Sequence, residues 1–86
     1  MDDKGRISLP RYFFHIVDGR TVRDEEGQDF PGLEEARAEA IGGARSIMRE
    51  ALWEGRLPLN ERIEVADENG TVLFTVPFRE AITIEE

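Results

Sequence analysis

His15 is the one histidine in this 86-residue chain, and acidic residues follow it closely in the stretch RYFFHIVDGRTVRDEEG, residues 11 to 27. An imidazole next to a carboxylate can transfer protons or bind a metal ion, so this pairing is the first candidate for chemistry. If residues 18 and 19 form a two-residue hairpin turn, His15 lies opposite Val22 and within diagonal reach of Asp24. The spacing thus predicts a polar cluster of His15, Asp24 and Glu26.

The neighbours of His15 favour a packing role over catalysis. Phe14 and Ile16 flank it in an aromatic and β-branched run that is typical of a half-buried strand. If both side chains face a helix, His15 lies on the opposite face of the strand with Phe13 and Val17. The chain has no cysteine and no second histidine, and its serines fall in the N-terminal segment and in the predicted helix. We therefore predict a packing or interface histidine, no catalytic residue and no enzymatic activity.

The segment RDEEGQD, residues 23 to 29, offers several carboxylates to a hard cation. Its spacing does not match an EF-hand loop, which needs alternating acids, a central glycine and a distant glutamate. Successive strand residues point to opposite faces, so Asp24 and Glu26 share a side that Glu25 does not. We interpret the segment as a solvated acidic turn before the helix, and we predict no metal ion and no cofactor.

The chain is acidic, with 19 Asp and Glu residues against 11 Lys and Arg residues and a formal net charge of −8. Nucleic acids and anionic membranes bind basic surfaces, so this balance argues against both as direct partners. It favours a basic protein partner, or solubility alone. No stretch approaches the ~20 apolar residues of a membrane span, and the N-terminal segment lacks the apolar core of a signal peptide. The expected location is the cytoplasm.

Two hairpins and one helix account for most of the chain. Residues 11–17 and 20–26 are expected to form the first hairpin around an Asp-Gly pair. Apolar residues at three- and four-residue spacing predict a helix over residues 33–54, with Gly55 just after its C-terminus. The pair Gly42-Gly43 disfavours a helix interior, and we expect it to mark a close approach to another element, with a local kink as the alternative.

The second hairpin spans ERIEVADENGTVLFTVPF, residues 61 to 78. If its Asn-Gly pair forms a two-residue turn, Val65 falls opposite Phe74, and Ile63 falls opposite Val76 on the same face. The apolar pattern requires that same register, so two independent signals agree.

The order of elements is ββαββ, which predicts a two-layer α+β domain with one helix packed on one face of a four-stranded, mainly antiparallel sheet. The domain covers residues 11–86 and follows a flexible N-terminal arm, residues 1–10. The first and fourth strands are the most apolar and are expected to be central. The predicted core comprises Leu33, Ala40, Ala44, Ile47, Ile63, Val65, Phe74 and Val76.

A single helix covers only one face of such a sheet. The other face is expected to carry apolar side chains, and a large apolar face usually finds a partner. We therefore expect a homodimer that forms through this open face or through an edge strand. The predicted protein-interaction residues are Phe13, His15, Val17, Ala66 and Leu73.

The segments PRYFFHIVDG, RDEEG, LEEARAEA and ADENGTVLFTVPF follow one another along the chain. In this order they resemble a family of small bacterial proteins of unknown function with a Tyr-Phe-Phe-His strand, an Asp-x-Glu-Gly turn, an Ala-rich helix and a C-terminal hairpin. The resemblance covers residues 10 to 80, with Arg11–Gly19, Asp24–Gly27 and Pro77-Phe78 as matching segments. It implies a shared fold and no activity. The segment MDDKGRISL and the Gly42-Gly43 pair are not typical of that family.

Three classes of function stay open. The one we favour is a small, acidic, non-enzymatic protein-interaction or regulatory module that forms a homodimer. A second class is an acidic inhibitor whose carboxylates mimic nucleic-acid phosphates and block a basic nuclease or DNA-binding protein. A third is a metal or catalytic site in which His15 acts with Asp24 or Glu26. The expected partners are a second copy of the chain and an unidentified, basic protein.

Overall fold

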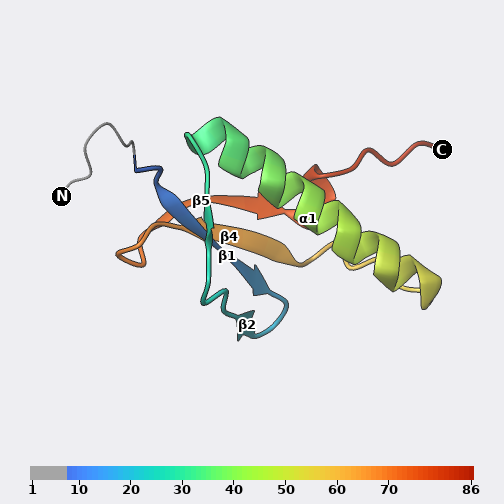
Figure 1. Cartoon of the computed structure of the whole chain (residues 1–86). Helices are drawn as coiled ribbons and strands as arrows, with labels where there is room; N and C mark the ends of the chain where they lie inside the picture. The colour runs from blue at the N-terminus through green and yellow to red at the C-terminus, as the bar shows by residue number, and fades with distance from the viewer. Residues whose placement is uncertain (1–7) are drawn as a thin grey trace.

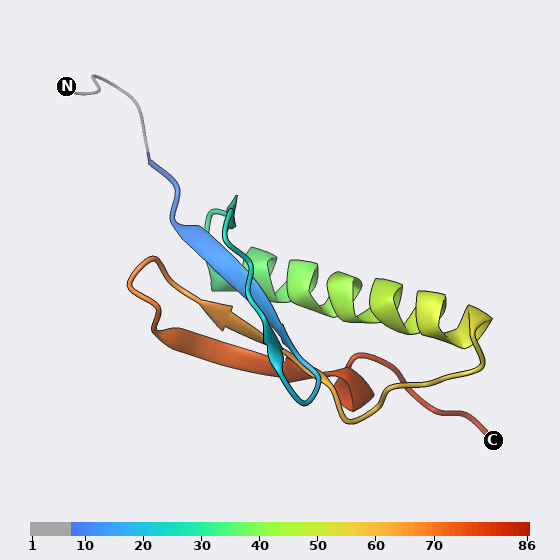
Figure 2. The same ribbon diagram turned by 90° about the horizontal axis from the view of Figure 1, so that it is seen from below.

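The computed structural model describes residues 8–86 and consists of one helix that crosses one side of a sheet (Figures 1 and 2). The helix, α1, spans Leu33–Trp53, and a short 3-10 helix, η1, spans Phe78–Glu80. The strands are β1 (Arg11–Val17), β2 (Thr21–Val22), β3 (Gln28–Asp29), β4 (Arg62–Ala66) and β5 (Val72–Pro77). This arrangement confirms the predicted α+β fold.

The predicted N-terminal arm, residues 1–10, falls mostly on residues 1–7, which lie outside the described residues. Residues 8–10 are exposed and have no regular secondary structure.

The strands follow the order β2-β1-β4-β5, and every pair is antiparallel. Both β2 and β3 pair with β1, so these two short strands lie along the same edge of β1. The prediction of central strands is correct for β1 and wrong for β5, which lies at the sheet edge, while β4 takes the second central position. β4 tolerates two charged residues there because Arg62 and Glu64 point away from α1 and form an ion pair, 3.1 Å between nitrogen and oxygen.

The β4–β5 hairpin has the predicted register, but a different turn produces it. Val65 pairs with Phe74 and Ile63 pairs with Val76, as the apolar pattern requires. The turn, however, holds three residues, because the N–H of Asp67 donates to the carbonyl of Thr71. A bulge between Ala66 and Val65 then adds one residue to β5 and restores the predicted pairing.

Alanines form the buried face of α1 and let the helix lie close to the sheet. On the sheet side, Val65 and Phe78 are fully buried, and Phe78 reaches the core from η1 just after β5. The predicted core residues Ala40, Ala44, Ile63, Val65 and Val76 are buried, and Ile47 and Phe74 pack against them partly buried.

The prediction that Leu33 is buried is wrong, because this side chain is 54% exposed. Phe30 precedes the helix and packs instead against the rings of Tyr12 and Phe14, with centroids 6.4 and 6.0 Å away. That aromatic cluster closes the core at the start of α1 and leaves Leu33 outside it.

The helix ends close to its predicted limits and runs through both internal glycines without interruption. Gly55 follows it with a φ of +82°, as expected for a residue after a helix C-terminus. The expected close approach at Gly42-Gly43 is wrong for Gly42, since a Cβ there would meet nothing within 4 Å. A Cβ on Gly43 would make only ordinary contact, 3.5 Å from Cδ1 of Ile63.

Candidate functional site

His15 lies in the middle of β1 and is buried, with only 6% of the residue exposed. Tyr12, Phe14 and Ile16 belong to the core under the helix. Side chains alternate along a strand, so His15 shares the opposite face with Phe13 and Val17. This is the orientation in which the histidine packs within the sheet, away from the helix.

The first hairpin differs in register from the prediction by one residue. Val17 pairs with Thr21 and Ile16 pairs with Val22, so the loop holds three residues around Gly19, which has a φ of +97°. Glycine adopts this left-handed conformation at little steric cost, which allows the chain to reverse within the loop. A one-residue change exchanges the two faces of a strand, and it brings Arg23, instead of Val22, beside His15.

The side chain of Asp24 organises the turn between β2 and β3. Its Oδ2 accepts a hydrogen bond from the backbone N–H of Phe14 at 3.1 Å. Its Oδ1 accepts two more, from the N–H groups of Glu26 and Gly27, each at 3.1 Å. Both carboxylate oxygens are therefore engaged with backbone donors of this chain.

The bond from Phe14 explains why a side-chain acceptor is needed at this position. The backbone N–H of Phe14 points toward the edge of β1 that pairs with β2 at Ile16 and with β3 at Tyr12. Between these two pairs the neighbouring chain turns away from β1, so the N–H of Phe14 lacks a backbone partner there. Asp24 supplies the acceptor in its place, and loss of the partner of this partly buried donor would cost up to ~1–3 kcal/mol.

The predicted contact between His15 and Asp24 exists, but it runs through the backbone. The N–H of Asp24 donates to Nδ1 of His15 at 3.0 Å, so this nitrogen acts as an acceptor. In the neutral ring the proton then sits on Nε2. His15 and Asp24 together tie the turn to β1, and they form no side-chain acid–base pair.

The environment of Asp24 shifts its acidity downward. Partial burial by itself raises the pKa of this carboxyl group. The three backbone hydrogen bonds and the electrostatic attraction of the nearby His15 act in the opposite direction and bring the pKa below its ordinary value of 3.8. The ionised carboxylate is thus the form that the fold stabilises.

Gly27 closes the turn at a position that only glycine fills easily. Its φ of +71° is a left-handed conformation. A Cβ there would also lie 2.8 Å from Cε2 of Phe13 and 2.9 Å from the carbonyl oxygen of Tyr12. The backbone of the turn therefore explains the first and last residues of the Asp-Glu-Glu-Gly motif, Asp24 and Gly27.

The third member of the predicted cluster, Glu26, joins it only through its backbone. Its N–H bonds to Asp24, and its carbonyl accepts from Nη1 of Arg11 at 2.6 Å. Its side chain is exposed. Arg11 also forms an ion pair with Asp29 at 3.0 Å, which holds β3 against the start of β1.

The predicted interaction residues differ in accessibility. Leu73 is 41% exposed, and Phe13 and Val17 are partly buried. Ala66 is 1% exposed and His15 is 6% exposed, so neither presents much surface to a partner. Ala66, on β4, has a small side chain, and it pairs with the larger Phe13 on β1.

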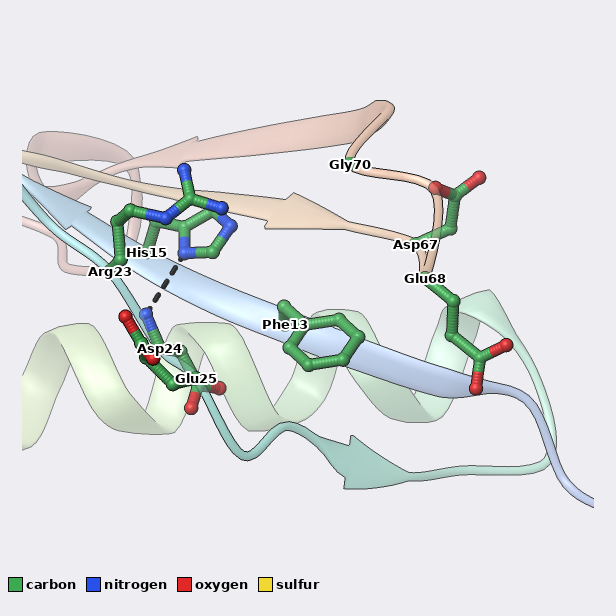
Figure 3. A pocket seen from close by; sticks show the side chains of 8 residues that line it. All are labelled: Phe13, His15, Arg23, Asp24, Glu25, Asp67, Glu68 and Gly70. Atoms are coloured by element: carbon green, nitrogen blue, oxygen red, sulfur yellow. Dashed lines mark hydrogen bonds between the residues drawn. The ribbon is translucent and has the colours of Figure 1, made fainter.

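An open hollow of about 270 Å³ lies over this part of the sheet (Figure 3). One end is formed by β1 and the Asp24 turn, and the other by the tip of the β4–β5 hairpin, with Phe13 between them. Its lining residues are Phe13, His15, Arg23, Asp24, Glu25, Asp67, Glu68 and Gly70.

Sequence reasoning missed Arg23 and the hairpin tip as neighbours of His15. The tip carries a signal that could have been used, because Asp67 precedes the turn and accepts from the N–H groups of Asn69 and Thr71 at 2.9 and 3.0 Å. Its distance from residue 15 along the chain hides the proximity, which arises only from the pairing of β1 with β4.

Within residues 8–86, no three side chains of the types that bind metal ions come together. In the same part of the chain, no helix combines the length and the apolar character needed to cross a membrane.

Comparison with known proteins gives one match. No curated protein and no solved structure matches the chain. A family model described as a domain of unknown function, DUF6894, matches residues 11–79, from the first residue of β1 to η1. This range contains both hairpins, the helix and the Asp24 turn. The chain therefore belongs to the DUF6894 family.

Proposed function

We propose that the protein is a small, non-enzymatic protein-interaction module that forms a homodimer through β5 and the adjoining part of the open sheet face. The cytoplasmic location expected from the sequence is part of this proposal. The observation that carries it is the position of β5, an apolar strand at the edge of the sheet.

The state of His15 and Asp24 supports an interaction module over an enzyme. Catalysis by such a pair needs a base or acid within reach of a substrate proton. Here Nδ1 of His15 and both oxygens of Asp24 already bond to backbone N–H groups. These bonds indicate that the pair stabilises the sheet. We therefore infer that the function lies in binding by the exposed edge and face of the sheet.

The backbone of β5 is suited to pairing with another strand. The N–H of Phe78 donates to the carbonyl of Glu61, which places every second residue, including Val76, in hydrogen-bonding position toward β4. The backbone N–H and C=O groups of Thr75 therefore point to the outer edge. No strand of the described chain pairs on that side.

The side chains next to this edge also favour association. Val72 and Leu73 are 47% and 41% exposed, and they lie at the start of β5. Exposed apolar edge strands readily pair with another chain. In an antiparallel pair centred on Thr75, the two copies would exchange both of its backbone hydrogen bonds. Pro77, which has no N–H, would limit the pairing at the other end of the strand.

Light scattering over a range of protein concentrations tests the proposal. The wild-type chain of 9.8 kDa should reach twice this mass. Each copy carries a formal charge of −8, so added salt should strengthen the dimer by screening their repulsion. Leu73→Lys places a charge at the edge and should give a monomer. Leu52→Lys, at a residue of 58% exposure on the helix, is the matched control and should stay dimeric.

A wild-type chain that stays monomeric at the highest soluble concentration would exclude the homodimer. Equal dimerisation of the wild type and Leu73→Lys would exclude β5 as the interface.

A further inference from the structure

The hollow over Phe13 combines a negative charge with a buried hydrogen-bond donor. Four acids and one arginine line it, together with His15. Glu25 and Glu68 are exposed and stand at opposite ends of the hollow, one on the Asp24 turn and the other on the hairpin tip (Figure 3). A positively charged group therefore fits the hollow better than an anion.

A bare metal ion is not the cation that this arrangement favours. Within the described residues no three ligand-type side chains converge, and Asp24 and Asp67 each use carboxylate oxygen to bind backbone N–H groups. A volume of about 270 Å³ lies just below the ~300–1,000 Å³ of small-molecule sites. It is of the size expected for one long side chain.

His15 supplies the second, independent feature. The ring is 6% exposed and lines the hollow, and Nδ1 accepts from the N–H of Asp24. Nε2 then carries the proton, and among residues 8–86 no protein group accepts a hydrogen bond from it. Nε2–H is thus a donor that faces the hollow without a protein acceptor, and a carbonyl oxygen placed in the hollow would bind it in place of water.

We propose that the hollow binds a lysine or arginine side chain of a partner protein, with the main-chain carbonyl of that residue accepting from Nε2–H of His15. The aliphatic stem lies over the ring of Phe13, and the cationic head group lies at the hairpin tip beside Glu68. This inference rests on the proposed function, since it takes the ligand to be part of a protein, and it identifies the charge of that ligand.

The dimensions of the hollow agree with this assignment. Phe13 pairs with Ala66, so the next residue, Asp67, is level with Tyr12 along the sheet. A strand rises about 3.3 Å per residue, which puts the hairpin tip roughly 10 Å from His15. An extended residue with a three- or four-carbon stem and a terminal cation covers a distance of this order. An aromatic ring beneath the path also attracts a cation.

The probe is the blocked tripeptide acetyl-Gly-Arg-Gly-amide, titrated into the ¹⁵N-labelled full chain at low salt and followed by NMR. Acetyl-Gly-Lys-Gly-amide should behave alike. The same peptide with citrulline in place of arginine has nearly the same shape without the charge, and it should bind at least fivefold more weakly. The expected shifts are those of the amides around the hollow and of Nε2–H of His15.

Matched variants separate the hollow from the overall charge. The double variant Glu25→Gln/Glu68→Gln removes one acid from each end of the hollow and should weaken binding about threefold to tenfold, because it removes the ion pair with Glu68 and the longer-range attraction of Glu25. Glu50→Gln/Glu85→Gln makes the same change in net charge at exposed positions outside the lining and should bind as the wild type does.

His15→Asn tests the donor separately. The asparagine carbonyl oxygen occupies the place of Nδ1 and keeps the bond from Asp24, while the group equivalent to Nε2 is lost. A folded His15→Asn chain should therefore bind the arginine peptide more weakly than the wild type does.

Equal binding of the arginine and citrulline peptides, or no shift around the hollow with either cationic peptide, would overturn the assignment. Equal weakening by both double variants would also overturn it, since the effect would then come from net charge alone. These outcomes are distinguishable from a failure of the homodimer, because the mass of the chain is measured without peptide.

Discussion

At the residue scale, the acid and the imidazole that the sequence singles out are bonded to backbone groups on either side of the same turn. Asp24 accepts from three N–H groups, and its own N–H is accepted by His15. Asp24 thus accepts from the N–H of Phe14, and His15 accepts from the N–H of Asp24. Both N–H groups lie where the pairing of β1 is interrupted, and they would otherwise lack a protein acceptor. The local structure therefore accounts for the spacing of His15 and Asp24 without a role in ligand binding.

The protonation of His15 follows from that contact. Because the N–H of Asp24 points at Nδ1, the neutral ring should carry its proton on Nε2. Long-range ¹H–¹⁵N correlation spectra at neutral pH distinguish the two tautomers. A proton found on Nδ1 would mean that the bond from Asp24 is absent in solution.

Replacement of Asp24 by asparagine tests the role of its carboxylate. The amide keeps one acceptor oxygen but turns a donor toward the N–H of Phe14, so we expect a loss of about 1–3 kcal/mol in the free energy of unfolding at neutral pH. Urea denaturation measures this loss. Glu25→Gln makes the same change in charge at an exposed neighbour and should change the free energy by less than about 0.5 kcal/mol.

The cost of Asp24→Asn should depend on pH in a defined direction. The pKa of Asp24 is lowered in the folded state, so its carboxylate stabilises the fold above the ordinary value of 3.8. That contribution is lost as the pH falls through the lower folded value. The difference between wild type and variant should therefore be full at pH 6 and shrink below pH 3.8. A difference that is constant down to pH 2 would contradict this account.

At the element scale, the turns are where sequence and structure differ most. The sequence predicts a two-residue turn in each hairpin, whereas both have three-residue turns with a glycine at positive φ. In the second hairpin a bulge compensates, so the apolar faces of β4 and β5 decide the register whatever the turn. In the first hairpin β2 is short and exposed, so no buried face opposes a change of register.

Two glycines should respond to alanine in opposite directions. Gly27→Ala combines a left-handed backbone with contacts of 2.8–2.9 Å and should lower the free energy of unfolding by about 1–3 kcal/mol. Gly42→Ala, on the exposed side of α1 with open space for a Cβ, should raise it by about 0.5–1 kcal/mol. Thermal and urea denaturation measure both. Destabilisation by Gly42→Ala would mean that the pair has a structural role beyond helix propensity.

The limits of prediction for the site are physical. The alternation of β1 predicts that Phe13 and His15 share one face, and the hairpin spacing predicts that Asp24 lies near the histidine, as it does. The hairpin tip with Asp67 and Glu68 reaches the same hollow only because β4 pairs with β1 after the whole helix has intervened. Pairing between distant strands is not encoded in local spacing. Similarly, Phe78 becomes the most buried aromatic residue through η1, a turn that no periodic pattern marks.

At the scale of the whole molecule, the excess of acids leaves one carboxyl group in an unfavourable position. Glu61 lies just before β4, and burial together with repulsion from Asp18 raises its pKa above 4.5, despite the attraction of Arg56. A raised pKa means that the protonated form suits the fold better. Its favourable contribution is present below 4.5 and is lost as the pH rises through the folded value.

Glu61→Gln should therefore stabilise the chain at pH 7 and have a much smaller effect at pH 3, where the wild-type carboxyl group is protonated in both states. Urea denaturation at the two pH values gives the comparison. Glu80→Gln, an exposed acid on η1, serves as the control for net charge. Stabilisation of equal size by both variants at pH 7 would assign the effect to overall repulsion instead of to the surroundings of Glu61.

The strands that pair with β1 lie at different distances along the chain, and this has a consequence for the rate of folding. The Asp24 turn closes one edge of β1 from nearby residues, whereas β4, on the other edge, follows only after α1. Closing so long a loop is slow, and the transition state should contain the β1–β4 pair. Substitutions on the outer surface of α1, such as Gly42→Ala, should then slow unfolding more than they speed folding. During synthesis on the ribosome, β1 can pair with β4 only after the residues beyond α1 have emerged.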